Sequence, residues 1–187
     1  MPQYLLSKVQ TAKKIAEIGV HKGATSLEFA KHLQSSGKLT LFDYKDVAKK
    51  VKNNLAERGF LNIEIFGCSY KYLDSYNWQL MKLIKYHTVP IYDYVYVDGA
   101  HTWAIDGLTF FLVDRLLMPG GFIDFDDYDW SFGGSPSLNP RVFPLTAKLY
   151  TEEQIESRQV RLIVDLLVKR DSRYKAVVEN KIFQKLR

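Results

Sequence analysis

The feature that most constrains the fold of this chain is its regular alternation of short apolar segments with amphipathic ones. Segments rich in β-branched and aromatic residues predict strands, and the segments between them carry apolar residues at helical spacing. The expected strands are residues 13–20, 38–44, 62–67, 92–99 and 121–127, and the expected helices are residues 24–37, 45–59, 70–87 and 104–121. This alternation predicts an α/β fold with a doubly wound, mainly parallel sheet.

The length of the chain limits the number of domains. A chain of 187 residues, of which 47% are hydrophobic, is long enough for one well-packed domain and short for two. We therefore expect residues 1–187 to form a single domain. Residues 151–171 predict a helix that begins with a capping box of Thr151 and Gln154, and residues 174–187 predict an edge hairpin that completes the sheet.

A segment rich in proline and glycine, residues 130–144, predicts a long loop. Its position after the last central strand indicates a loop over the active site. Trp130, Phe132, Arg141 and Phe143 are candidates for binding a substrate there. Exposed aromatic side chains also mark subunit contacts, so a homodimer stays open as an alternative.

Three features bear on the compartment. No apolar run reaches the roughly 18 residues of a membrane helix. The first 14 residues lack the apolar core and cleavage site of a signal peptide, and the one cysteine, Cys68, cannot form an internal disulfide. We expect a cytoplasmic protein with no membrane partner.

The formal net charge of +5 raises the question of a nucleic-acid partner. Lysines and arginines are spread along the chain, and there is no arginine-rich run or RNA-reading motif. We interpret the small basic clusters as solvated helix faces and a basic tail, so the sequence does not favour nucleic acid.

The first strand leads into a turn that contains Gly19 and Gly23. Glycines at these positions let the backbone approach a ligand, although a close helix–strand crossing would explain them equally well. A dinucleotide fingerprint would need glycine at positions 19, 21 and 24, but the chain has His21 and Ala24. A nicotinamide-dependent oxidoreductase is therefore the weaker alternative.

The second and third strands end in residues suited to a nucleoside. Asp43 closes the second strand, where its carboxylate could accept both hydroxyls of a ribose, although it could also cap the following helix. The third strand ends in the turn Gly67–Ser69, which is suited to flank an adenine ring.

Acidic residues gather at the ends of the next two strands. Asp98 follows the fourth strand, and Asp126 and Asp127 close the fifth, which should lie beside it. A hard divalent cation, with Mg²⁺ the usual choice, would relieve the repulsion among these carboxylates. A solvated acidic strand end, with Asp127 capping a turn, is the alternative. Asp124 lies inside the strand, and we expect it to pair with a base from the sheet edge rather than with a metal.

These segments, in this order, resemble the class I S-adenosylmethionine-dependent methyltransferases, particularly the small-molecule and sugar O-methyltransferases of the macrocin O-methyltransferase type. The resemblance covers about Ile15 to Trp130 and implies a Rossmann-like methyltransferase fold. By this resemblance, acids at positions 98, 126 and 127 are the metal ligands. The residues implied to hold the methyl donor are Glu17, Gly19, Val20, Gly23, Thr25, Asp43, Tyr44, Gly67, Cys68, Ser69 and Asp98.

His101 follows Asp98 by three residues and is the best candidate for a catalytic base. An alcohol accepts a methyl group well only if its proton leaves, and imidazole exchanges protons near neutral pH. Some relatives carry an acid where Ala100 stands here, and this departure leaves His101, with Asp98 beside it, for the catalytic role. The alternative is a structural histidine that caps the helix starting near Trp103.

The sequence thus predicts methyl transfer from S-adenosylmethionine to a hydroxyl group of a small molecule, a sugar or polyol, assisted by Mg²⁺ or a similar cation. Two alternatives stay open. One is the nicotinamide-dependent oxidoreductase, and the other is a non-catalytic binding subunit with the same fold.

Overall fold

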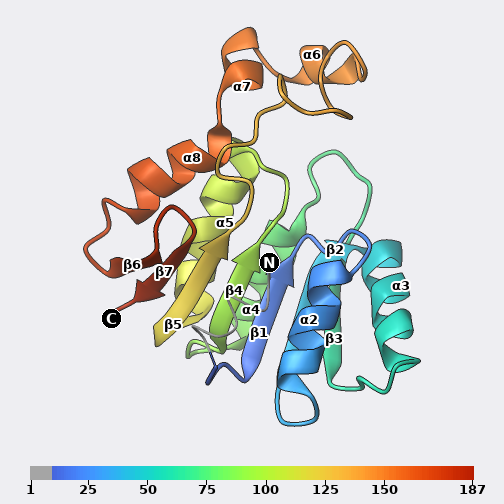
Figure 1. Ribbon diagram of the computed structural model, residues 1–187, viewed down its shortest axis with the longest axis vertical. Helices are drawn as coiled ribbons and strands as arrows, with labels where there is room; N and C mark the ends of the chain where they lie inside the picture. The colour runs from blue at the N-terminus through green and yellow to red at the C-terminus, as the bar shows by residue number, and fades with distance from the viewer. Residues whose placement is uncertain (1–9) are drawn as a thin grey trace.

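The computed structural model of this chain describes residues 10–187, and its centre is one seven-stranded sheet (Figure 1). The strand order is β3-β2-β1-β4-β5-β7-β6, and β7 is the one strand antiparallel to the other six. The expected mainly parallel, doubly wound fold is therefore confirmed, and so is the edge hairpin, formed by β6 and β7. The strands are β1 (Lys14–Ile18), β2 (Lys38–Tyr44), β3 (Ile63–Cys68), β4 (Tyr92–Val97), β5 (Leu117–Phe125), β6 (Tyr174–Val178) and β7 (Ile182–Lys185).

Helices cover both faces of the sheet, as parallel strands joined by helical crossovers require. One face carries α2 (Ala24–Leu33) and α3 (Lys45–Ala56). The other carries α4 (Tyr76–Tyr86), α5 (Trp103–Leu116) and α8 (Gln159–Ile163), which continues into the π-helical turn η1 (Val164–Val168). The short helices α6 (Leu145–Leu149) and α7 (Glu152–Glu156) project beyond the sheet at the top of Figure 1.

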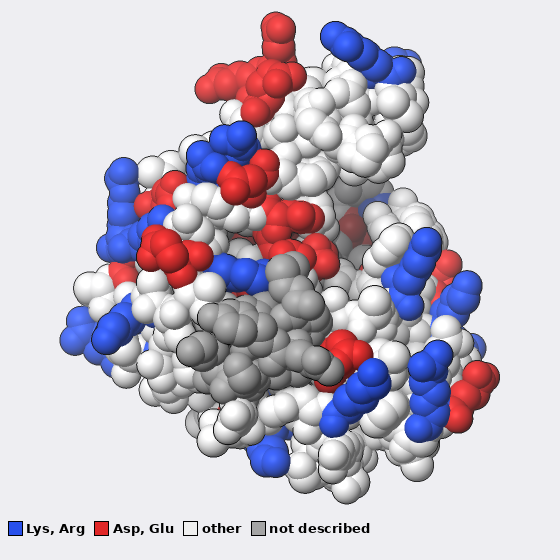
Figure 2. Space-filling view, in the orientation of Figure 1, with Lys and Arg blue, Asp and Glu red and all other residues white. Residues whose placement is uncertain are grey.

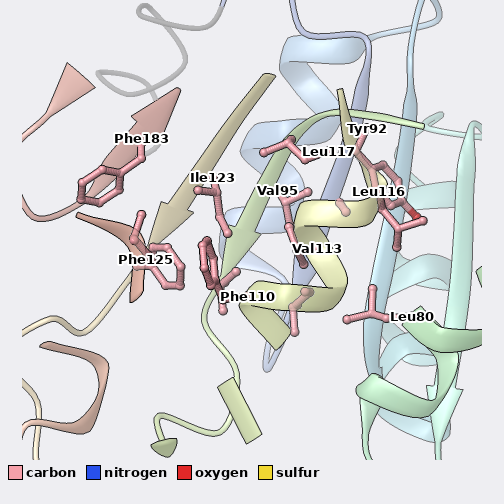
Figure 3. Close-up of a cluster of buried hydrophobic side chains, with 14 of the residues drawn as sticks. Leu80, Tyr92, Val95, Phe110, Val113, Leu116, Leu117, Ile123, Phe125 and Phe183 are labelled. Carbon is pink, nitrogen blue, oxygen red and sulfur yellow. The ribbon is translucent and has the colours of Figure 1, made fainter. Parts of the chain in front are cut away.

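The two faces of the sheet bury separate hydrophobic cores. Along β4, Tyr94 and Tyr96 point to the core under α2 and α3, while Val95 and Val97 point to the core under α4, α5 and α8. Figure 3 shows the second core, in which Phe110 and Val113 of α5 lie against β4, β5 and β7. This period of two along a strand buried on both faces explains the nearly continuous apolar segment 92–97.

Several predicted boundaries were wrong. Helix α2 ends at Leu33 instead of continuing to residue 37, because Gln34 takes a left-handed backbone with φ of 48°. Helix α4 begins at Tyr76 instead of residue 70, where the Ser75 side chain accepts a hydrogen bond from the Asn77 amide. Residues 117–120, expected at the end of a helix, start β5 because Leu117 pairs with Tyr92 before an irregularity in the ladder. The single helix expected over 151–171 is broken into α7, α8 and η1.

Other expectations about the second half of the chain were correct. Residues 131–144 contain no helix or strand. Thr151 and Gln154 form the expected capping box at the start of α7.

The expectation that the N-terminus carries no export signal falls partly on residues 1–9, which lie outside the described residues. Within residues 10–187, no helix is both long and apolar enough to span a membrane.

The core under α5 allows a direct test of the packing. Phe110 is 1% exposed and its neighbour Phe111 is 53% exposed. Truncation of a buried phenylalanine removes its transfer free energy and leaves a cavity, so Phe110→Ala should lower the free energy of unfolding by about 3 to 5 kcal/mol. Phe111→Ala should change it by about 0.5 kcal/mol or less. Urea denaturation measures both, and equal losses in the two variants would contradict this assignment of helix faces.

Candidate functional site

The turn after β1 makes a backbone contact with the end of β4. Gly19 has φ of 83°, and a Cβ built on it would lie 1.9 Å from the carbonyl oxygen of Asp98. The Asp98 amide donates to the carbonyl oxygen of Ile18 over 2.8 Å. Gly23, with φ of 80°, packs against Val51 of α3 in the same way. Close packing therefore requires both glycines, and it brings the β1–α2 turn against the carboxyl end of β4.

Asp43 joins the end of β2 to the same turn. Its Oδ2 accepts hydrogen bonds from the amides of Val20, over 2.8 Å, and His21, over 3.1 Å. Its Oδ1 accepts from the amide of Tyr44, which is the N-cap residue of α3 and provides no side-chain cap. Asp43 is thus not the capping residue of α3, and its half-buried carboxylate faces a cleft.

The cleft has a volume of about 720 Å³ and runs along the carboxyl ends of the strands. Gly19 lies in its wall, Asp43, Tyr44 and Cys68 line one part of it, and Asp98 and His101 line another. Figure 2 shows Asp and Glu side chains gathered in the middle of this face, beside the hollow below the projecting part. A cleft of this size suits a ligand the size of a nucleoside derivative. The β3–α4 loop contributes the lining residues Tyr70, Lys71, Tyr72, Asp74 and Ser75.

Several predicted donor-binding residues do not line this cleft. Gly67 and Ser69 line a smaller neighbouring hollow, which Cys68 also borders. Val20 reaches the site through its backbone amide alone, and Gly23 and Thr25 lie at the start of α2. Glu17 is 1% exposed, and burial raises the pKa of its carboxyl group well above the usual value. Its Oε2 atom is buried and has no hydrogen-bond partner among the described residues. A polar atom beneath the β1–α2 turn is therefore unsatisfied.

Asp98, His101 and Asp127 converge at one end of the cleft, where Asp98 and His101 form part of the wall. The Nε2 atom of His101 lies 3.8 Å from Oδ1 of Asp98 and 3.5 Å from Oδ2 of Asp127. One ligand atom from each of the three side chains falls within 4.8 Å of the others. His101 and Asp127 both have left-handed backbones, with φ of 56° and 57°. Residues other than glycine adopt this conformation rarely, Asp and His more readily than most, and such residues cluster at functional sites.

The charge of this group depends on burial and on its neighbours. Burial, and after it the negative charges of Asp126 and Asp127, raise the pKa of Asp98 to about 6 against the attraction of His101. A divalent cation would relieve this repulsion, and the two carboxylates and the imidazole are ordinary ligand types for one. The alternative in which Asp127 only caps a turn does not explain why its carboxylate faces His101.

Asp126 does not join this group. Its Oδ2 accepts from the Tyr96 hydroxyl over 2.6 Å, and its Oδ1 lies 3.0 Å from Nζ of Lys181. These bonds hold the pKa of Asp126 below its usual value in spite of burial. Asp124 is fully buried and pairs with the same lysine over 3.1 Å, as expected for an acid that needs a base from the sheet edge.

Tyr76 and Asp106 hold the loop that carries His101, and neither residue was predicted from the sequence. The Tyr76 hydroxyl donates to the buried carboxylate of Asp106 and accepts the Ala100 amide over 2.9 Å. A Cβ on Gly99 would lie 2.2 Å from this hydroxyl. An acid inside the apolar segment of α5 was the available signal for Asp106. His101 does not cap α5, whose N-cap residue is Thr102.

Aromatic side chains connect the site to the projecting segment. The rings of His101 and Trp130 lie 5.1 Å apart, those of Trp130 and Phe132 4.8 Å, and those of Phe132 and Tyr150 4.5 Å. Phe132 is buried in this row, so it supports the loop. Arg141 and Phe143 are exposed and do not line the cleft. Their positions therefore do not support the substrate-binding role expected for them.

Comparison with solved structures finds the same fold in several methyltransferases. An O-methyltransferase from Bacillus cereus, in complex with S-adenosylhomocysteine, is 15% identical with a TM-score of 0.63, and the match covers 100% of this chain and 79% of that one. The S-adenosylhomocysteine-bound methyltransferase PaMTH1 from Podospora anserina is 16% identical, with a TM-score of 0.63 and coverage of 98% and 76%. The O-methyltransferase TomG from Streptomyces achromogenes, involved in tomaymycin synthesis, is 21% identical, with a TM-score of 0.54 and coverage of 78% and 64%.

No curated protein sequence matches the chain significantly. A family model described as a methyltransferase domain matches residues 16–128, which is more than half of the chain. The matched region includes the Gly19 turn, Asp43, Asp98, His101 and Asp127. The match agrees with the resemblance seen in the sequence and decides against the nicotinamide-dependent oxidoreductase. The chain belongs to the methyltransferase-domain family.

Proposed function

We propose that this protein transfers a methyl group from S-adenosylmethionine to a hydroxyl group of a small molecule, a sugar or polyol, with the help of a divalent cation. The observation that carries the proposal is the continuous cleft from Asp43 to Asp98 and His101. S-adenosylhomocysteine is bound in the Bacillus cereus and Podospora anserina structures, and S-adenosylmethionine in TomG, which supports the same donor here.

The residues of the cleft fit such a donor. Asp43 accepts two backbone amides on Oδ2 and the Tyr44 amide on Oδ1, which leaves acceptor capacity on Oδ1 for the ribose. Only glycine fits at position 19, where the backbone forms the cleft wall. Asp98 lies at the far end and suits the charged methionine part. When bound, the donor presents an electrophilic methyl group on a sulfonium centre.

Asp98 and Asp127 would hold the cation, with His101 beside them. A bound divalent cation favours loss of the proton from a hydroxyl group that it contacts. His101 would accept that proton, and Trp130, which packs on the imidazole, would limit the access of water. The carboxylates in and beside the cleft would repel the phosphates of a nucleic acid, so they support a small molecule as the methyl acceptor. These residues are Asp43, Asp74, Asp98 and Asp127.

The assignment of Asp43 can be tested with a matched control. Asp43→Ala should weaken the binding of S-adenosylhomocysteine by about 2 to 4 kcal/mol, because charge-assisted hydrogen bonds are lost. Asp93 also accepts two backbone amides through one oxygen, those of Lys13 and Lys14, but does not line the cleft. Asp93→Ala should therefore leave the affinity unchanged. Isothermal titration measures both variants, and equal affinities in the two would contradict the ribose role.

The cation site can be tested with Mn²⁺, whose binding is followed by electron paramagnetic resonance. Asp127→Asn should weaken binding by at least about tenfold. Asp129→Asn should not, since Asp129 is exposed and pairs with Arg161. Because the pKa of Asp98 is raised to about 6, its carboxylate is charged above that pH and protonated below it. Mn²⁺ affinity should therefore fall as the pH drops below about 6, and an affinity independent of both Asp127 and pH would exclude this site.

The role of His101 is tested by methyl transfer from labelled donor to a panel of sugars, polyols, catechols and RNA. We expect label in the sugar or polyol fraction. His101→Ala should lower kcat by roughly 10² to 10⁴ with unchanged affinity for S-adenosylhomocysteine, as for loss of a general base. His87→Ala, at the end of α4, should have no effect. Full activity of His101→Ala would show a structural role, and loss of Mn²⁺ binding would show that His101 is a ligand instead.

A further inference from the structure

Lys181 lies in the turn between β6 and β7, and Figure 1 shows this hairpin beside β5. Its Nζ atom lies 3.0 Å from Oδ1 of Asp126, 3.1 Å from Oδ1 of Asp124 and 3.2 Å from the carbonyl oxygen of Phe125. The contacts to Asp126 and Phe125 are hydrogen bonds, and the contact to Asp124 is an ion pair. The side chain is 18% exposed and therefore largely shielded from water.

Tyrosines of β4 take the remaining oxygens of both acids. Tyr94 donates to Oδ2 of Asp124, and Tyr96 donates to Oδ2 of Asp126 over 2.6 Å. Each oxygen of Asp126 thus has a partner. By contrast, the side chains of Asp98 and Asp127 have His101 as their one ion-pair partner among the described residues, at 3.8 and 3.5 Å.

We propose that Lys181 is a positioning residue that holds Asp126 out of the cation site and leaves Asp98 and Asp127 as its carboxylate ligands. This inference rests on the proposed cation site. A cation that used Asp126 would have to displace an ammonium group that makes hydrogen bonds to Asp126 and Phe125 and an ion pair with Asp124, against the repulsion of like charges. The consequence is a site with fewer protein ligands, which keeps coordination positions for water or an acceptor hydroxyl, as Mg²⁺ sites commonly do.

The first test asks whether Asp126 contributes to cation binding in the natural chain. Mn²⁺ titrations of the full chain with S-adenosylhomocysteine, followed by electron paramagnetic resonance, give the affinity. Asp126→Asn should leave the Mn²⁺ affinity within about twofold of the wild-type value, whereas Asp127→Asn should lower it. A loss in Asp126→Asn as large as that in Asp127→Asn would overturn the inference.

The second test releases Asp126. Lys181→Met should raise the Mn²⁺ affinity about tenfold or more, because the number of charged ligands sets the affinity of such sites. The gain should disappear in Lys181→Met/Asp126→Asn. Lys169→Met is the control for general charge, since Lys169 pairs with Asp165 and Glu179 and should not affect binding. If the unpaired Asp124 prevents Lys181→Met from folding, Lys181→Met/Asp124→Asn removes that buried charge and should show the same gain.

The outcomes separate this inference from the proposed function. If the wild type binds Mn²⁺ and removal of Lys181 does not strengthen binding, Lys181 has no such role and the cation site stands. If the wild type does not bind Mn²⁺ but Lys181→Met does, Lys181 keeps Asp126 from the cation. The proposal that a cation assists the natural protein is then wrong. If neither binds, both ideas are wrong.

Discussion

The contact between Gly19 and the Asp98 carbonyl group is the constraint on which the site depends. β1 and β4 are neighbours in the sheet, so their carboxyl ends leave it side by side. A side chain at position 19 would overlap the Asp98 backbone and force the two turns apart. With glycine there, Asp43 can bind the amides of the first turn while Asp98 and His101 emerge directly beside it. The proposed donor end and the reactive end therefore share one cleft.

The same crowding concentrates negative charge at the carboxyl ends of β4 and β5. Within residues 10–187, the fold pairs two of these acids with a lysine and leaves the other two without one. Asp124 and Asp126 share the positive charge of Lys181, and each also accepts a hydrogen bond from a tyrosine hydroxyl, Tyr94 or Tyr96. Asp98 and Asp127 have His101 as their one ion-pair partner among the described residues, and burial together with the neighbouring carboxylates raises the pKa of Asp98. One pair of acids is thus paired structurally, and the other remains available for a ligand.

The architecture and the position of the cleft could be predicted from the sequence because they follow from local patterns. Alternating strands and helices place Asp43, Asp98 and Asp127 at one edge of the sheet, and the structure has them there. The division of roles among neighbouring acids could not be predicted, because it depends on Lys181, more than 50 residues away in sequence from Asp126. The Tyr76 and Asp106 pair was missed for the same reason, since two helices bring it together.

The central claim is that one cleft places a methyl donor against a cation held by Asp98 and Asp127. A crystal structure with S-adenosylhomocysteine and Mn²⁺, with anomalous scattering used to locate manganese and sulfur, tests it most directly. We expect the ribose on Asp43, the sulfur near Asp98 and His101, and manganese between Asp98 and Asp127 with Lys181 still on Asp126. Manganese bound to Asp126 with Lys181 displaced, or a ligand outside the cleft, would contradict it.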